Sequence, residues 1–140
     1  MKEGGRMQGG WLKEEYYDCY ARYLLAFMQG YAREGVHLHA ITVQNEPMAL
    51  NSRYPTTLML PHAEIDLIAS HIGPLLRNAS STVRIWAFDH NFDGGLVDYP
   101  QQLLRSAARQ FVDGVAYHNY AGQAPLRSQP QTPLISRCKV

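Results

Sequence analysis

The chain has 140 residues, of which 46% are apolar, and its formal net charge at pH 7 is +1. This composition is typical of a soluble globular domain. Without a block of lysine or arginine, it gives no basis for binding nucleic acid or an anionic membrane. No apolar stretch approaches the length of a membrane-spanning helix, and residues 1–10 lack the apolar core of a signal peptide.

The first predicted element is a helix over residues 13–34, and Gly35 is its predicted C-cap. Its large apolar residues recur at spacings of three and four. They are Tyr16, Tyr20, Tyr23, Leu24, Phe27 and Tyr31. We expect this aromatic stripe to pack on a sheet and not to stack on a sugar.

A short apolar run at residues 36–43 predicts a buried strand, and the triplet Asn45-Glu46-Pro47 begins one residue after it, beyond Gln44. A carboxylate at the C-terminal end of a parallel strand is where (β/α)8-barrel enzymes place catalytic groups. Pro47 disfavours helical geometry at Glu46 and restricts its backbone. The alternative for Glu46 is an ordinary surface carboxylate at the start of a loop.

A second helix is predicted over residues 61–78, with Pro61 in its first turn. Leu60 is a poor N-cap, since it has no side-chain oxygen to accept a hydrogen bond. Gly73 and Pro74 are expected to kink or restart the helix near its C-terminal third.

The remaining pattern is a strand at 83–88, a polar loop at 89–98, a helix at 99–111 and a strand at 115–117. Three strands separated by helices predict parallel βαβ units. From residue 121 the composition changes to Gln, Pro, Ser and Arg without periodicity. We expect residues 123–140 to form a disordered tail outside the domain of residues 1–122.

Several motifs, in this order, resemble glycoside hydrolase family 30, the glucosylceramidase and endo-β-1,6-glucanase relatives. They are Met1-Lys2, Gly9-Gly10-Trp11-Leu12, Gln44-Asn45-Glu46-Pro47, Tyr54-Pro55, Ile72-Gly73-Pro74, Trp86-Ala87-Phe88-Asp89-His90-Asn91 and Asp113-Gly114-Val115-Ala116-Tyr117-His118. The combination is more similar to the β-1,6-glucanase-like branch than to the animal glucosylceramidases. The resemblance covers residues 1–122 and implies the central part of a (β/α)8 TIM barrel, about three βα units.

The resemblance implies a retaining β-glycosidase that works by double displacement with Glu46 as general acid/base. Retaining enzymes use two carboxyl groups, one protonating the leaving oxygen and the other attacking the anomeric carbon. In the family the residue before the acid/base, here Asn45, binds the sugar 2-hydroxyl. The alternative for Asn45 is an amide that satisfies loop backbone.

Four further substrate-binding residues are expected at the same end of the sheet. By resemblance, His118 and Tyr120 line the sugar site, whereas Asn119 stands where many relatives carry Trp. Asp89 ends its strand and either binds sugar hydroxyls or caps the loop. Tyr54 is a weaker candidate for the cleft wall.

A complete (β/α)8 barrel needs about 250 residues. The family's nucleophile is a Glu on the strand after His118, yet the sequence contains no Asp or Glu beyond that residue. We therefore expect a truncated product without its nucleophile, and the alternative function is an inert fragment that is at most a weak carbohydrate binder. With both sheet edges unpaired, we expect marginal stability and aggregation.

The substrate implied is a carbohydrate or glycolipid, such as glucosylceramide or a β-1,6-glucan, and the parent protein would be secreted or periplasmic. No cofactor is expected. Asp89 to Gly94 match half of a calcium loop, but its twelfth position is Pro100 instead of Glu. His37 and His39 share a strand face without a third ligand, so we expect no metal site. Cys19 and Cys138 match no metal or disulfide spacing and are expected to be unpaired.

Overall fold

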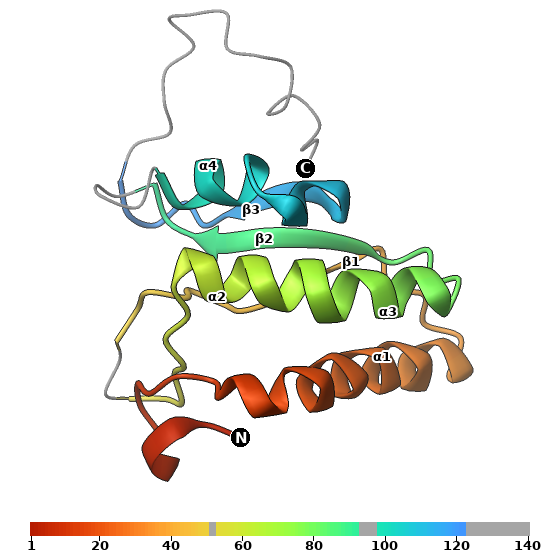
Figure 1. Ribbon diagram of the computed structural model, residues 1–140, viewed down its shortest axis with the longest axis horizontal. Helices are drawn as coiled ribbons and strands as arrows, with labels where there is room; N and C mark the ends of the chain where they lie inside the picture. The colour runs from red at the N-terminus through yellow and green to blue at the C-terminus, as the bar shows by residue number, and fades with distance from the viewer. Residues whose placement is uncertain (51–52, 93–97, 123–140) are drawn as a thin grey trace, which may run out of the picture.

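The computed structural model describes residues 1–50, 53–92 and 98–122 (Figure 1). Within these ranges three strands form one parallel sheet in the order β1-β2-β3. They are β1 (Ala40–Thr42), β2 (Arg84–His90) and β3 (Val112–Tyr117). Each predicted strand is present, and the predicted parallel βαβ arrangement is confirmed.

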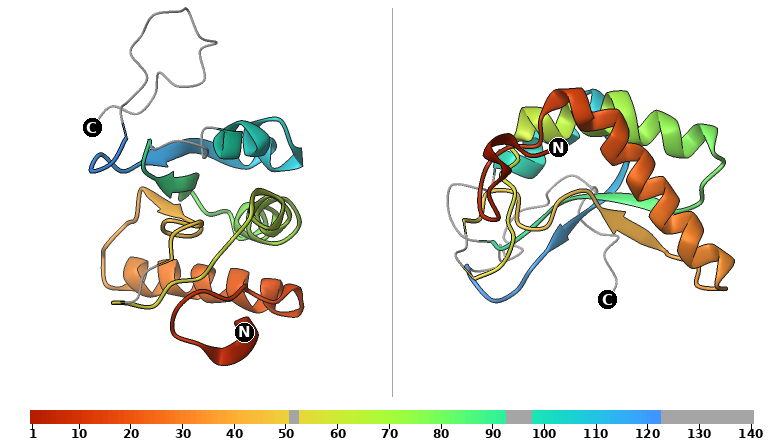
Figure 2. Two further views of the ribbon diagram at one scale, coloured as in Figure 1. Left: turned by 90° about the vertical axis from the view of Figure 1, so that its left-hand side faces the viewer. Right: turned by 90° about the horizontal axis from the view of Figure 1, so that it is seen from below.

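Helical segments connect the strands and precede them. They are η1 (Glu3–Gly5), η2 (Glu14–Tyr16), α1 (Tyr17–Arg33), α2 (Pro61–Asp66), the π-helical segment η3 (Leu67–Ile72), α3 (Gly73–Asn78), α4 (Asp98–Leu104) and η4 (Ala107–Gln110). Figure 2 shows α1, α2, α3 and α4 on the same side of the sheet. In the described part of the chain no helix covers the opposite face. None of the described helices is long and apolar enough to cross a membrane.

The helix α1 ends as its sequence predicts. Gly35 has a φ of 81°, a left-handed conformation that costs glycine little. Its N–H donates to the Ala32 carbonyl at 3.0 Å, and the N–H of Val36 donates to the Tyr31 carbonyl at 2.9 Å. This pair of bonds is the Schellman motif, which satisfies carbonyls that the helix itself leaves free.

The prediction that the aromatic stripe of α1 packs on the sheet is wrong for three of its members. Tyr23, Phe27 and Tyr31 are 58%, 42% and 45% exposed, whereas Ala21 and Met28 are buried. The helix α1 packs against η3 and α3, and its buried face includes Ala21 and Met28. Of the stripe, Tyr20 and Leu24 do pack against the core.

A continuous helix runs from Pro61 to Asn78, and its geometry changes as the sequence predicts. The π-helical turns of η3 end where α3 begins with Gly73 and Pro74. Because Pro74 has no N–H and its ring would clash with the carbonyl four residues earlier, the wider π turn accommodates it. At the other end Leu60 makes no side-chain cap, which confirms that it is a poor N-cap.

The core lies between the helices and the sheet. Fully buried aliphatic side chains come from η3, α3, β2 and α4, and each contributes about 1.5–3 kcal/mol by leaving water. They are Leu67, Ile68, Ile72, Leu76, Ile85 and Leu103. Glu64 of α2, which continues into η3, reaches Phe88 near the end of β2, close to the candidate site.

Candidate active site

Three of the predicted site residues meet at the C-terminal edge of the sheet. Glu46 follows β1, Asp89 lies near the end of β2, and His118 follows β3. The His118 ring lies between the two carboxyl groups, with Nδ1 2.9 Å from Glu46 Oε1 and Nε2 3.0 Å from Asp89 Oδ1. In a parallel sheet these strand ends share one edge, so the alternation of strands and helices brings the three residues together.

Glu46 is held in a fixed backbone conformation and is largely buried. Its φ is 45°, in the left-handed region that non-glycine residues seldom adopt. Its N–H donates to the Asp89 carbonyl at 3.0 Å, and its carbonyl accepts from the N–H of Ala49 at 2.9 Å. The Pro47 carbonyl then accepts from the N–H of Met59 at 2.7 Å. Only 8% of the Glu46 side chain is exposed, so the carboxyl sits in a site with little water.

Asp89 is presented by a turn at the end of β2. Phe88 and Asp89 have φ angles of 75° and 53°, and the register of the ladder shifts between Phe88 and His90. This turn directs the Asp89 carboxylate toward His118, while its second oxygen, Oδ2, accepts from the Thr42 hydroxyl at 2.7 Å. Both oxygens of Asp89 are therefore engaged within the protein.

His118 is oriented by its backbone as well as by the two carboxylates. Its N–H donates to the His90 carbonyl at 2.9 Å, which extends the pairing of β2 and β3 by one residue. When both ring nitrogens carry protons, the imidazolium donates to Glu46 and Asp89 simultaneously. The ring therefore bridges the two carboxyl groups that follow β1 and end β2.

The chain beyond His118 is fastened to β2 through one buried amide. Asn91 is 3% exposed, and its Oδ1 accepts from the N–H of Tyr120 at 3.2 Å and of Ala121 at 3.1 Å. The Tyr120 ring lies 5.6 Å from the His118 ring, centroid to centroid, but is 71% exposed. Tyr120 therefore borders the cluster and is open to solvent, and its role in lining a sugar site stays a prediction.

Two predicted residues are not drawn into this cluster. Asn45 is exposed beside Glu46, and its carbonyl accepts from the side-chain amide of Gln44 at 3.0 Å. Tyr54 is 44% exposed, and none of the described hydrogen bonds or ring contacts joins it to the cluster. Their substrate-binding roles stay predictions.

Three residues that hold the site were not singled out from the sequence. Thr42 lies in a predicted strand and Asn91 ends one of the family motifs, but nothing in the pattern showed that their side chains contact Asp89 and the chain after His118. The burial of Glu64 could have been predicted, because it stands four residues before Ile68 and therefore on the apolar face of the helix. A carboxyl group at such a position is rarely buried without a role.

Glu64 is fully buried and accepts at Oε1 from the N–H of Phe88 at 3.2 Å. Burial raises the pKa of its carboxyl from 4.5 to about 7, and the negative charge of Asp89 acts in the same direction. The nearby Tyr99 hydroxyl and the Phe88 N–H partly offset this rise in pKa. The carboxyl therefore changes its protonation state near neutral pH.

The geometry leaves one oxygen of Glu46 available for chemistry. Oε1 faces His118, whereas Oε2 has no hydrogen-bond partner in the described ranges. A proton carried on Oε2 can be given to a bound ligand while the imidazole holds the other oxygen in place. This is the geometry that a general acid needs.

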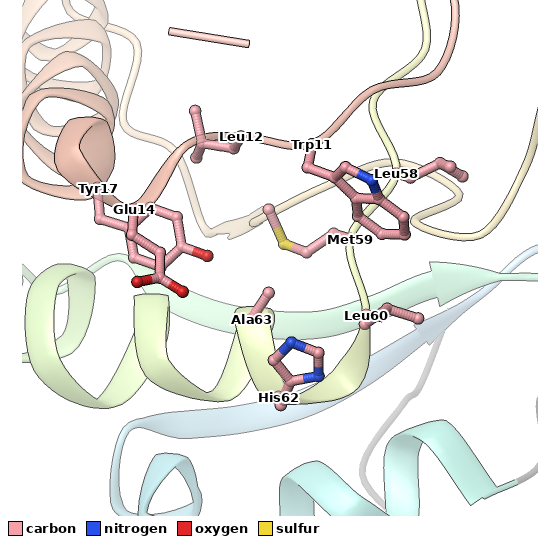
Figure 3. Close-up of a pocket in the computed structure, with 9 residues that line it drawn as sticks. All are labelled: Trp11, Leu12, Glu14, Tyr17, Leu58, Met59, Leu60, His62 and Ala63. Carbon is pink, nitrogen blue, oxygen red and sulfur yellow. The ribbon is translucent and has the colours of Figure 1, made fainter. Parts of the chain in front are cut away.

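A separate pocket lies between the start of α1 and the start of α2 (Figure 3). Its volume is about 290 Å³. It is lined by Trp11, Leu12, Glu14, Tyr17, Leu58, Met59, Leu60, His62 and Ala63. None of Glu46, Asp89 and His118, the acid/base cluster, lines this pocket, so the pocket is not part of the candidate site. In residues 1–50, 53–92 and 98–122 no three His, Cys, Asp or Glu side chains are grouped as metal ligands would be.

The model of the glycosyl hydrolase family 30 TIM-barrel domain matches residues 1–132 of the chain. The chain is 38% identical over 121 residues to an endo-1,6-beta-D-glucanase of Aspergillus fumigatus, covering 86% of this chain and 24% of that protein. It is 31% identical over 131 residues to the lysosomal acid glucosylceramidase of Mus musculus, covering 86% of this chain and 25% of that protein.

Among solved structures, the endo-beta1,6-glucanase BT3312 superposes with a TM-score of 0.76 at 32% sequence identity. The superposition covers 83% of this chain and 26% of that chain. The chain thus spans about a quarter of the length of these relatives. The predicted fold class, part of a (β/α)8 barrel, is confirmed.

Proposed function

Because the chain belongs to glycosyl hydrolase family 30, as its motifs predicted, we propose that it forms the acid/base part of a retaining β-glycosidase site. The observation that carries this proposal is the contact of a buried carboxyl, Glu46, with an imidazole from a different strand end. Glu46 is the general acid that protonates the glycosidic oxygen and the base that later activates water.

The proton moves at Oε2 of Glu46. In the first step Oε2–H gives its proton to the leaving oxygen, and in the second step the same oxygen takes one from water. The ring of His118 stabilises the carboxylate that forms between these steps, because its Nδ1 faces Oε1 at 2.9 Å. Asp89 in turn holds Nε2 and so fixes the plane of the ring.

Asp89 is not the attacking carboxylate in this proposal. Its two oxygens are engaged by His118 and Thr42, and attack on an anomeric carbon would break one of these bonds. The sequence holds no Asp or Glu after His118, the region where the family carries its nucleophile, so this proposal assigns no nucleophile among the 140 residues. The 140-residue chain by itself is then inert, or at most a weak carbohydrate binder.

The substrate class proposed is a β-linked glucoside. The relative at 38% identity is named for cleavage of a 1,6-β-D-glucan and the relative at 31% identity as a glucosylceramidase, and both names describe a glucose-containing substrate. Asn45, Asp89, His118 and Tyr120 would contact the sugar around Glu46, with Tyr54 further out on the cleft wall. No cofactor takes part in this chemistry.

The acid/base role is tested in a chimera in which residues 1–122 replace the matching segment of the Aspergillus fumigatus relative. Glu46→Gln is expected to slow hydrolysis of an unactivated β-1,6-glucan by roughly 10² to 10⁴-fold, the range of general acid catalysis. An activated aryl β-glucoside, which needs little help in leaving, should be affected less in its first step. Azide, a nucleophile that needs no base, should restore turnover of that substrate.

Gln44→Asn, a conservative change two residues before Glu46, is the control for local disturbance. Equal losses on both substrates without azide rescue would exclude the acid/base role of Glu46. The unmodified 140-residue chain is assayed in parallel with an aryl β-glucoside. Activity that Glu46→Gln abolishes in this chain would show that a working nucleophile is present within it.

A further inference from the structure

One carboxyl group outside the acid/base cluster has no exposed surface at all. Glu64 points from α2 to the end of β2, where its Oε1 accepts from the N–H of Phe88 at 3.2 Å. Its other oxygen, Oε2, is buried and has no hydrogen-bond partner in the described part of the chain. Burying a carboxyl in this way is costly, so the group is expected to have a purpose beyond filling space.

The partner of Glu64 is a backbone group that the sheet cannot satisfy. Phe88 is 1% exposed and has a φ of 75°, and the ladder between β2 and β3 shifts its register just beyond it. A buried N–H without an acceptor costs about 1–3 kcal/mol. Glu64 removes that cost and so allows β2 to leave regular strand geometry at this point.

The turn at Phe88 sets the orientation of Asp89, which directly follows Phe88. In this turn its carbonyl accepts from the N–H of Glu46, while its carboxylate faces His118 and Thr42. A regular strand at Phe88 would direct these groups elsewhere. The orientation of the acid/base pair therefore depends on a turn that Glu64 supports from behind the sheet.

A second set of contacts leads from the same carboxyl to the loop of Glu46. The Tyr99 hydroxyl, which interacts with Glu64, donates to the Met59 carbonyl at 3.0 Å. The N–H of Met59 donates to the Pro47 carbonyl at 2.7 Å. Pro47 follows Glu46 directly, so both flanks of the site connect to the region around Glu64.

We propose that Glu64 is a positioning residue: its buried carboxyl holds the Phe88–Asp89 turn that presents Asp89 to His118 and, through His118, orients Glu46. The proposal rests on the proposed function for its catalytic meaning, since Glu64 does not touch the substrate. The hydrogen bonds themselves are properties of the folded chain and are measurable without any substrate.

The surroundings of Glu64 favour its neutral form. Tyr99 faces it from α4, Asp89 from β2 and Tyr20 from α1, and none of these groups is a cation. A neutral carboxyl at this position still accepts from Phe88 through its carbonyl oxygen, and its O–H can donate to the Tyr99 oxygen. An amide has the same capacity, which makes Glu64→Gln a conservative variant.

The test compares Glu64→Gln with Glu64→Met in the full 140-residue chain. Methionine has a similar volume but cannot accept from Phe88. We expect hydrogen exchange of the Phe88 amide to become at least about tenfold faster with methionine, the equivalent of one hydrogen bond. The NMR signal of His118 Nε2–H, which depends on Asp89, should be lost. With Glu64→Gln the exchange rate of the Phe88 amide should stay within about twofold of wild type, and the His118 ring signal should be retained.

A folded Glu64→Met variant whose His118 ring signals are unchanged would overturn the proposal. If that variant does not fold, a titration of the unchanged chain decides the matter. The Phe88 and Asp89 amide resonances should then move together with a midpoint near pH 7, and Glu64→Gln should abolish both steps. An Asp89 amide resonance that does not change over this pH range would also overturn the proposal.

These readouts separate the two ideas. If Glu46→Gln has no effect on general acid catalysis while Glu64→Met still disturbs His118, the proposed function fails and the positioning of the turn stands. If Glu46→Gln behaves as an acid/base variant while Glu64→Met leaves His118 unchanged, the positioning role fails and the proposed function stands.

Discussion

At the scale of single residues, the site joins a few carboxyl groups in very different surroundings. Glu46 and Asp89 share one imidazole and retain some exposure, with 8% and 17% of their side chains accessible. Glu64 lies behind them with no exposure and without a cationic partner. This difference in exposure fits their proposed roles. A carboxyl group that exchanges protons with a ligand must be accessible to it, whereas one that accepts a hydrogen bond from the backbone can be fully buried.

The burial of Glu64 makes the stability of the fold dependent on pH. Its pKa is about 7 in the folded chain and about 4.5 when exposed, so the folded state binds the proton more tightly. The stabilisation is complete below pH 4.5 and is lost as the pH rises to about 7, by about 3 kcal/mol in total. Glu64→Gln should remove this slope, which urea unfolding at a series of pH values would measure.

Glu14→Gln is the control for the Glu64 variant, since Glu14 is an exposed carboxyl group in η2.

The contact between Asp18 and His71 changes the stability with pH in the opposite direction, and it does so at lower pH. The hydrogen bond from His71 lowers the pKa of Asp18, so the stabilisation that it gives disappears only as the pH falls below about 4. A wild-type chain that is equally stable at pH 5 and pH 7 would contradict the expected slope.

The sequence predicted where Glu46, Asp89 and His118 lie in the fold, but it did not predict the contacts between them. Each of the three follows a predicted strand within three residues, and parallel strands share their C-terminal edge. Their hydrogen bonds span 72 and 29 residues of sequence and depend on left-handed backbone at Glu46, Phe88 and Asp89. No local residue pattern predicts that conformation at a phenylalanine, because it is unfavourable there and is imposed by tertiary contacts.

At the scale of elements, most helix positions were predictable, although the helix predicted over 99–111 is divided into α4 and η4, and the buried face of α1 was not predictable. The limits of α1 agree with the predicted helix to within a few residues, and Gly35 ends it as expected. The choice between the aromatic stripe and the face of Ala21 and Met28 was made by the neighbouring helix. Helices pack through interlocking side chains, and a sequence does not show which neighbour a helix will meet.

Gly73 shows the same dependence on a neighbour. Its φ of −59° suits any residue, so its role is one of space. A Cβ there would lie 2.2 Å from Phe111 Cγ and 2.7 Å from the Ile68 carbonyl oxygen. Gly73→Ala should therefore destabilise the fold by about 1–3 kcal/mol through overpacking, although alanine is the better helix former. Equilibrium unfolding in urea would measure the change.

Gly30→Ala is the matched control within α1. A Cβ at Gly30 would meet only Arg33 Nη2, at 3.8 Å, so this change should stabilise the chain by up to about 1 kcal/mol. Combining Gly73→Ala with Phe111→Leu should recover part of the lost stability, because the ring is the nearest obstruction. A Gly73→Ala chain as stable as wild type would contradict the packing argument.

At the scale of the whole molecule, the described residues form an open part of a barrel. The helices cover one face of the sheet (Figure 2), while β1 and β3 are its edges. In the relatives the same segment is about a quarter of the chain. A parallel sheet normally has both faces covered, and its unpaired edges offer a template for other strands. The 140-residue polypeptide is therefore expected to self-associate through these edges.

The edge of β1 allows a sharp test of this expectation. The N–H of Arg84 donates to the His39 carbonyl, and alternate residues of a parallel strand bond to the same neighbour. The backbone N–H and C=O of Ile41 therefore point toward β2, whereas the N–H of Ala40 points away from the sheet. Ala40→Pro should remove only the outward donor and reduce concentration-dependent association in sedimentation velocity, with little change in thermal stability. Ile41→Pro, the same change one residue later, should instead destabilise the sheet. Wild-type chain that sediments as a monomer at every concentration and unfolds cooperatively would refute the expectation.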